Sequence, residues 1–350
     1  MNIQRNNSME DNMSFINKTS RILDDNPQWE DVYSGYAESL TKNKGKYLSN
    51  GKLFRVKKPL LVYSSLGKVK TDAGSTCYDL RFAGQSIGEI SVNREGKVHL
   101  SVDANQAKYA KEHFGFIASD ELKRVDWKGY KSSEFRKFYY AISSIEGVGI
   151  KSEEHRIESF LLKEFSKKTR LEDKKLCNIQ PVRLGNKFFQ LTTPIKASTH
   201  NPEFSMNSRG GATGGGIDIL SRIRHSNNES RIAVMELKDQ NKSSEPQRDA
   251  MFQALTYATF LAYLFRSKSG KTWWNLMRPE SANDEKAVPK HLDIDVVTIM
   301  PKKGCSMEGD LNAIDVLHLN TTFHLYTLYY DVDSNGNPCQ FTGTLTNNIL

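Results

Sequence analysis

Two carboxylates and a lysine in the second half of the chain have the types and spacing of a metal-dependent catalytic site. Glu236 and Lys238 lie two positions apart, so on a β-strand both side chains leave the same face. If Asp218 on a neighbouring strand points to that face, the two carboxylates repel each other unless a divalent cation neutralises them. Mg²⁺, with Mn²⁺ as a substitute, would polarise a phosphoryl oxygen there, and Lys238 would position the attacking water. The pattern therefore favours phosphodiester hydrolysis, the alternative being an edge-strand salt bridge.

The pattern of an acidic residue, any residue and a lysine is not specific by itself. Even the longer spacing recurs, since Asp103 precedes Glu121 by as many residues as Asp218 precedes Glu236. Only the copy that ends at Lys238 lies in a strand, turn and strand pattern with a helix pattern on each side. The competing tripeptides are Glu95-Gly96-Lys97, Glu121-Leu122-Lys123, Glu172-Asp173-Lys174 and Asp284-Glu285-Lys286.

The elements that must position these residues follow from the periodicity of apolar residues. A stripe that includes Ile157, Leu161 and Phe165 predicts a helix over 153–168. Helical spacing of apolar residues predicts a second helix over 246–265. Apolar runs bounded by turn residues predict strands between and after these helices. The expected strands are 187–193, 216–223, 231–238 and 292–300.

The order helix, three strands, helix and strand, with Asp218 and Glu236-Leu237-Lys238, resembles the PD-(D/E)XK nuclease superfamily over residues 150–300. The resemblance implies an α/β fold with a restriction-endonuclease-like αβββαβ core and a mixed central sheet. It implies that Asp218, Glu236 and Lys238 are catalytic. It also implies that the two carboxylates and the Leu237 backbone carbonyl bind the metal ion.

The resemblance extends to a glutamate on the first helix and a glutamine on the second. The glutamate is Glu154 or Glu158, of which Glu154 lies nearer the centre of the apolar stripe and would support a metal ligand or a second ion. Alternatively, both are solvated acids that complement the helix dipole. The glutamine is Gln253, within the expected helix. One position departs from the family pattern, because Ile217 rather than proline precedes Asp218.

Basic and aromatic residues near these elements could contact nucleic acid. Arg209 lies in the glycine-rich loop 208–216, Tyr257 lies on the second helix, and Lys268 and Lys271 follow that helix. The alternatives are a plain connecting loop and polar residues at the boundary of the core. The loop lacks the Lys-Ser/Thr ending of a P-loop, so no nucleotide cofactor is expected.

The composition favours a polyanionic partner. The 350 residues include 49 Lys and Arg against 41 Asp and Glu, a net charge of +8, so nucleic acid, DNA first, is the expected partner. The four cysteines have no close spacing, which excludes a disulfide scaffold and indicates a reducing compartment. The polar N-terminus and the lack of a long apolar run predict a cytoplasmic protein without a membrane partner.

Three segments are expected along the chain. Residues 1–30 are polar and predict a flexible arm. Residues 31–148 predict a β-rich α+β accessory domain that could recognise the substrate, and residues 149–350 carry the nuclease-like domain. The antiparallel strands expected in the accessory domain are 59–64, 76–82, 86–92 and 97–102.

These observations together predict a Mg²⁺-dependent endonuclease that hydrolyses DNA and could act as a homodimer. The resemblance implies a 5′-phosphate product and associates the chain with restriction or genome defence. Three alternatives stay open: a catalytically inactive nucleic-acid-binding protein of the same fold, a nuclease acting on RNA, and an enzyme whose β-rich domain binds a small ligand.

Overall fold

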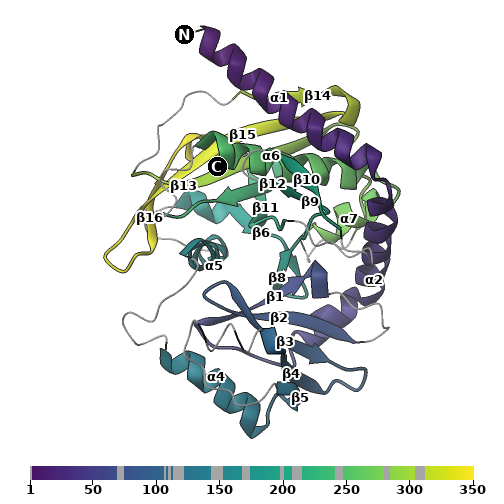
Figure 1. Ribbon diagram of the computed structural model, residues 1–350, viewed down its shortest axis with the longest axis vertical. Coiled ribbons are helices and arrows are strands. Elements are labelled where there is room, and N and C mark those ends of the chain that lie inside the picture. Colours follow the sequence, from purple (N-terminus) through teal and green to yellow (C-terminus); the bar gives the residue numbers. More distant parts are fainter. Residues whose placement is uncertain are drawn as a thin grey trace. The chain divides into compact units, whose positions relative to one another are not determined.

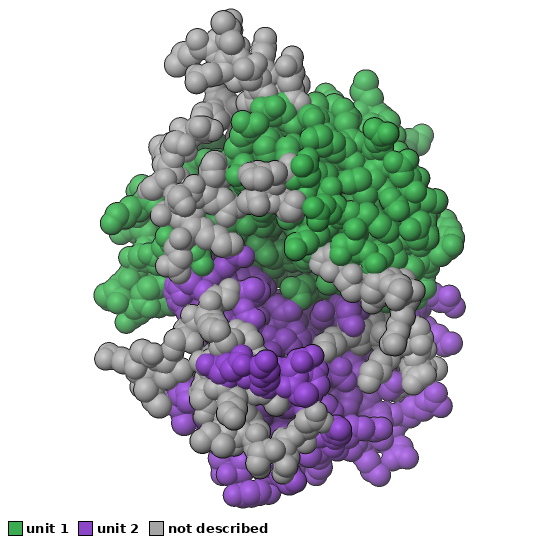
Figure 2. Space-filling model, viewed as in Figure 1, with its two compact units in different colours: residues 1–37, 160–182, 190–350 green, residues 38–159, 183–189 purple. Residues whose placement is uncertain are grey.

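The chain is a mixed α/β protein, and its internal contacts divide it into two compact units (Figures 1 and 2). Unit 1 comprises residues 1–37, 160–182 and 190–350, and unit 2 comprises residues 38–159 and 183–189. The computed structural model describes residues 2–68, 75–105, 122–142, 153–167, 174–197, 201–206, 215–240, 247–279, 284–303 and 312–350, together with Lys108 and Glu112.

These units differ from the expected domains 31–148 and 149–350. The N-terminal helix belongs to unit 1, and a short hairpin from the second half of the chain belongs to unit 2. Two helices run from one unit into the other, α2 (Gln28–Asn50) and α5 (Glu153–Phe165). The expected helix 153–168 is confirmed as α5.

A mixed sheet forms the centre of unit 1. Its strands run in the order β14-β15-β13-β12-β11-β6, and β16 pairs with β15. Strands β12, β13 and β15 are parallel neighbours, whereas β11 is antiparallel to both β12 and β6. The strands are β6 (Ile179–Pro181), β11 (Ile219–Arg224), β12 (Ser230–Leu237), β13 (Leu292–Pro301), β14 (Ile314–Val316), β15 (Thr321–Val332) and β16 (Pro338–Thr342).

The expected strands 216–223, 231–238 and 292–300 are confirmed as β11, β12 and β13. Strand β13 is buried from Ile294 onward because it lies inside the sheet and is covered on both faces. The helix that connects β12 to β13 is α6, and it packs against both strands, as a crossover between parallel strands must.

Helix α6 (Gln247–Arg266) confirms the expected helix 246–265. None of the described helices has the length and apolar character that a membrane span requires. The remaining elements of unit 1 are η2 (Lys174–Asn178), the paired strands β9 (Ile195–Ala197) and β10 (Pro202–Phe204), α7 (Gly270–Leu276), η4 (Leu317–Leu319) and α8 (Thr344–Asn348).

The N-terminal segment forms helix α1 (Asn2–Asp25), so the expected flexible arm over residues 1–30 is wrong. Ile16 is fully buried, and the Phe15 ring stacks on Phe252 of α6 with 3.8 Å between ring centroids. Figure 1 shows α1 running alongside α6. A helix buries one face with few apolar side chains, so a polar composition does not exclude packing.

The expected strand 187–193 is divided in the structure: residues 187–190 join the sheet of unit 2, whereas residues 191–193 bond to the segment 215–217 just before β11. In the structure β7 (Arg183–Leu184) and β8 (Lys187–Gln190) form a hairpin in the sheet of unit 2, and the neighbour of β11 is β6. Gly185 and Asn186 both have positive φ, which makes the tight turn of this hairpin. Local sequence predicts the strand but does not say which sheet it joins.

Unit 2 is built on a second sheet with strand order β5-β4-β3-β2-β1-β8-β7. Neighbours from β1 to β5 are antiparallel, which confirms the strands expected between residues 59 and 102. Its elements are β1 (Leu60–Ser65), η1 (Leu66–Lys68), β2 (Thr76–Phe82), β3 (Gln85–Val92), β4 (Val98–Val102), β5 (Leu122–Asp126) and α4 (Tyr130–Ile142), with the hairpin β7–β8.

A histidine in the loop between β11 and β12 ties the C-terminal helix to the sheet of unit 1. His225 Nδ1 lies 2.7 Å from the Asn348 carbonyl oxygen, and Nε2 lies 2.6 Å from Asp295 Oδ2. Both partners are acceptors, so both ring nitrogens donate and the imidazole is cationic. Burial by itself would lower the pKa of His225, but the hydrogen bond and charge of Asp295 raise it overall. Arg231 Nη1 lies 3.4 Å from the other Asp295 oxygen.

We expect the stabilisation from His225 to be fully present below pH 6.5, its ordinary pKa, and to be lost as the pH rises through the raised folded-state pKa. The difference in unfolding free energy between wild type and His225→Gln should therefore shrink as the pH rises, which chemical denaturation across a pH series measures.

The control for this experiment is His291→Gln. His291 bonds the neutral side chains of Asn320 and Thr322, so this variant removes a histidine without removing a histidine–carboxylate pair. A pH-independent difference for His225→Gln would contradict the role of the imidazolium.

Candidate active site

Glu236 and Lys238 meet at the end of β12, inside the sheet of unit 1. The two side chains lie on one face of the strand, and Lys238 Nζ donates to Glu236 Oε1 at 3.0 Å. Both are buried, with 5% and 3% of their surfaces exposed. Strand β12 lies between β11 and β13, so the predicted salt bridge is present but lies at the centre of the sheet and not on an edge strand.

Asp218 lies beside the tripeptide, just before β11. Its Oδ2 accepts a hydrogen bond from the Leu237 amide at 2.9 Å. The antiparallel register pairs Ile219 with Met235, so one step further Asp218 stands opposite Glu236. Opposed residues of an antiparallel pair point to the same face. The fold thus brings the three predicted residues together.

Gln253 of α6 completes this group. Its Oε1 accepts a hydrogen bond from Lys238 Nζ at 2.6 Å. The ammonium group is therefore shared between Glu236 on its own strand and Gln253 on the crossover helix. A buried ion pair is stable only when further hydrogen bonds satisfy its remaining donors, and Gln253 provides one.

Tyr330 contacts the site, and the sequence did not reveal it. Its hydroxyl, on β15, donates to the Lys238 backbone carbonyl at 2.9 Å, and the residue is fully buried. The run of β-branched and aromatic residues over 321–332 predicts a strand. No local signal, however, says that this strand lies beside β13 or that its tyrosine reaches Lys238.

The two candidate glutamates lie at the start of α5, within unit 2. Glu158 is buried, with Oε1 3.9 Å from Arg81 Nη1 on β2. Burial raises the pKa of Glu158 to about 7, although Arg81 and Tyr63 oppose the shift. Glu154 lies one turn earlier on the same helix and also belongs to unit 2, so its role at the site of unit 1 stays a prediction.

The residues expected to contact nucleic acid have different surroundings. Tyr257 is buried, and a β-carbon at Gly215 would overlap its hydroxyl, so its ring packs on the loop backbone. Lys268 and Lys271 are exposed and pair with acidic side chains, Lys268 with Asp31 and Lys271 with Glu285. Arg209 lies outside the described residues.

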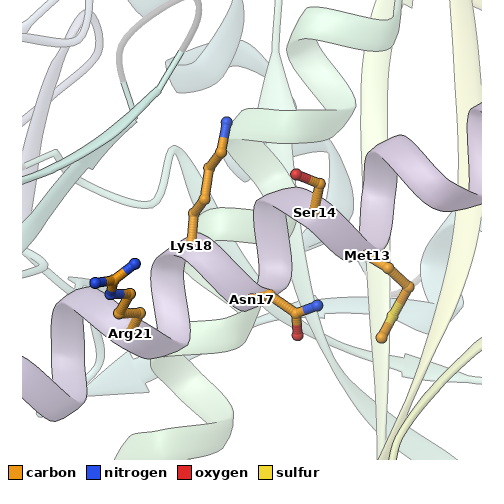
Figure 3. Close-up of a pocket in the computed structure, with 5 residues that line it drawn as sticks. All are labelled: Met13, Ser14, Asn17, Lys18 and Arg21. Atoms are coloured by element: carbon orange, nitrogen blue, oxygen red, sulfur yellow. The ribbon is translucent and has the colours of Figure 1, made fainter.

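A shallow hollow on the surface of α1 contains none of these residues (Figure 3). Lys18 Nζ donates to Asn201 Oδ1 at 3.2 Å, and Arg21 lies 3.7 Å from Asp25. Because one helix supplies all its lining residues, the hollow does not define a binding site. They are Met13, Ser14, Asn17, Lys18 and Arg21.

The carboxylates of Asp218 and Glu236 are the oxygen ligands that the chain would offer to a divalent cation at this site. In the described part of the chain no three or more His, Cys, Asp or Glu side chains are grouped to hold a metal. Mg²⁺ in proteins, however, is usually held by one or two carboxylates together with water and substrate oxygens. Asp218 and Glu236 supply two carboxylates. The Leu237 carbonyl points to the same strand edge as its amide, which is bonded to Asp218.

Comparisons with known proteins add nothing to this geometry. No known family model matches the chain, and no curated protein or solved structure is significantly similar to it. The function must therefore be argued from the site itself.

We expect Tyr330→Phe to lower the unfolding free energy by about 1 kcal/mol, because a buried hydrogen bond to the Lys238 carbonyl is lost. The amide resonance of Asp239, which shares that peptide unit, should shift in nuclear magnetic resonance spectra.

Tyr329→Phe is the matched control for this prediction. The Tyr329 hydroxyl is also buried but donates to Gln247 Oε1 at 2.5 Å. This variant should lose comparable stability without moving the Asp239 resonance. An unchanged resonance in Tyr330→Phe would show that the hydroxyl does not hold Lys238.

Proposed function

We propose that the protein is a metal-dependent nuclease that hydrolyses phosphodiester bonds of DNA. The observation that carries this proposal is the meeting of Asp218, Glu236, Lys238 and Gln253 at the end of one central strand. The same four residues, in the same chain order, are what the resemblance to the PD-(D/E)XK superfamily implies for a catalytic site.

The arrangement of strands supports the finer fold proposal, a restriction-endonuclease-like core. In chain order the core would be α5, β6, β11, β12, α6 and β13. The first three strands form an antiparallel run, and β13 returns parallel to β12 after the crossover helix. This core contains β6 where the sequence alone had indicated the strand 187–193.

In the proposed reaction Asp218, Glu236 and the Leu237 carbonyl would hold Mg²⁺, or Mn²⁺ in its place. The ion, when bound, polarises the phosphoryl oxygen and lowers the pKa of the attacking water. Lys238 orients that water, and for this its ammonium group must turn away from Glu236. Gln253 holds the same ammonium by a second hydrogen bond and so restricts where it can turn.

The partner and biological context are part of the same proposal. The net charge of +8 supports a nucleic acid substrate, and DNA is proposed ahead of RNA. Glu154 would support a ligand or a second ion. A 5′-phosphate product, action as a homodimer, and a role in restriction or genome defence follow only from the family resemblance.

We expect Asp218→Asn to reduce divalent-dependent cleavage of DNA by about 100-fold or more, because a metal ligand is lost. Asparagine keeps an oxygen that can accept from the Leu237 amide, so the fold should persist. Lys238→Ala should abolish cleavage too, with circular dichroism used to check folding. The assay uses supercoiled, linear and single-stranded DNA and RNA with Mg²⁺, Mn²⁺ or EDTA.

The matched control for the lysine is Lys97→Ala. Glu95 and Lys97 form the same type of tripeptide and lie 3.0 Å apart, but their side chains are 67% and 69% exposed. This variant should cut at the wild-type rate. Wild-type cleavage by Asp218→Asn would overturn the assignment, and DNA binding without any cleavage would favour the non-catalytic alternative.

We expect binding to duplex DNA without metal to weaken with salt, with a log-log slope of about −3.6 if roughly four phosphates are neutralised. Replacing Lys268 and Lys271 together by alanine should make the slope shallower by about 1.8. Ca²⁺ should tighten binding without supporting cleavage, because it screens the carboxylates but holds its ligands loosely.

Fluorescence anisotropy across a salt series measures these slopes. The control is Lys302→Ala, since Lys302 is also exposed and paired, at 3.4 Å, with Asp331. A flat response to salt, or no binding to any DNA or RNA, would favour the small-ligand alternative.

A further inference from the structure

A threonine on β13 stands directly beside Glu236 in the sheet of unit 1. The parallel register pairs Glu236 of β12 with Thr298 of β13. Paired residues of adjacent strands point to the same face, and the strands lie about 4.8 Å apart. Since Asp218 stands opposite Glu236 on the β11 side, Glu236 is flanked across the sheet by Asp218 and Thr298.

The hydroxyl of Thr298 is buried and has no hydrogen-bond partner among the described residues. The residue is 1% exposed, and Oγ1 has no partner in the described part of the chain. Burying an unpaired hydroxyl is unfavourable, and valine would fill the same space without that cost. The position therefore carries a polar group that the packing of the sheet does not require.

Thr298 is the one polar residue on its face of strand β13. Every second side chain of β13 lies on the face that carries Thr298. The other side chains of β13 on this face are apolar. The single hydroxyl occurs at the register position of Glu236. The apolar members are Leu292, Ile294, Val296 and Met300.

We propose that Thr298 is a positioning residue for Glu236, an inference that rests on the proposed nuclease function. Lys238 holds Glu236 Oε1 in this structure, and it must release that oxygen to orient the attacking water. Thr298 then donates its hydroxyl to the Glu236 carboxylate and keeps it directed toward the metal ion. Groups that orient a ligand in this way commonly change both metal affinity and rate when they are removed.

The test compares Thr298→Val, Thr298→Ser and Ser221→Ala with wild type. Ser221 is the matched control, because its hydroxyl is also fully buried and without a partner in the described residues. Its register partner is Ala233, so it lies on the opposite face of the sheet from Glu236. Each protein is assayed for Mn²⁺ affinity by electron paramagnetic resonance, for single-turnover cleavage against Mn²⁺ concentration, and for melting temperature.

We expect Thr298→Val to bind Mn²⁺ about tenfold more weakly and to cleave at least about tenfold more slowly. Its melting temperature should stay the same or rise, because an unpaired buried hydroxyl has been removed. Thr298→Ser restores the hydroxyl and should recover both properties. Ser221→Ala should match wild type in affinity and rate.

The outcomes separate this inference from the proposed function. If wild type cleaves and Thr298→Val has the same Mn²⁺ affinity and rate, the role of Thr298 is refuted and the nuclease function stands. If wild type binds Mn²⁺ without cleaving, the nuclease function is refuted, and the Mn²⁺ affinities of the variants decide the role of Thr298. If wild type neither binds nor cleaves, both are refuted.

Discussion

The buried ion pair between Lys238 and Glu236 imposes the constraint around which unit 1 is arranged. Two charges removed from water are stable only when hydrogen bonds satisfy their remaining groups. Three elements provide contacts at the end of β12: α6 through Gln253, β15 through the Tyr330 hydroxyl, and the segment before β11 through Asp218. The neighbouring strands and the crossover helix therefore all contribute contacts to the end of β12.

The charged pair of His225 and Asp295, in the same sheet, differs from the site because its polar atoms all have partners. At His225, both ring nitrogens are engaged, and both oxygens of Asp295 have cationic partners. That network links the β11–β12 loop to the C-terminal helix and leaves the imidazole no nitrogen to act on a ligand. At the end of β12, by contrast, Asp218 is only partly buried, and the hydroxyl of Thr298 has no partner among the residues that the structure describes. This difference is the reason why chemistry is proposed at the end of β12 and a structural role at His225.

Burial separates the copies of the acidic-x-lysine tripeptide more clearly than spacing does. Glu95 and Lys97 form an ion pair of the same length as Glu236 and Lys238, 3.0 Å. The first pair is mostly exposed, so water screens its charges and it contributes little. The second pair is buried in a central strand, where water screens the two charges little and they interact strongly. Glu158 is also a candidate by sequence, and it lies buried 3.9 Å from Arg81 within unit 2.

The sequence by itself determined the local geometry of this protein. Alternation placed Glu236 and Lys238 on one face, the polar loop after β11 predicted a hairpin, and apolar periodicity predicted α5 and α6, because these features depend on neighbouring residues. Only the tertiary structure decided which strands share a sheet. It paired β6 with β11 and divided the expected strand 187–193 between the two units. It also packed the polar α1 against α6 and brought Tyr330 and Thr298 to the candidate site from strands far along the chain. Those contacts are long-range, and a sheet neighbour is chosen by packing over the whole unit rather than by any pattern within the strand.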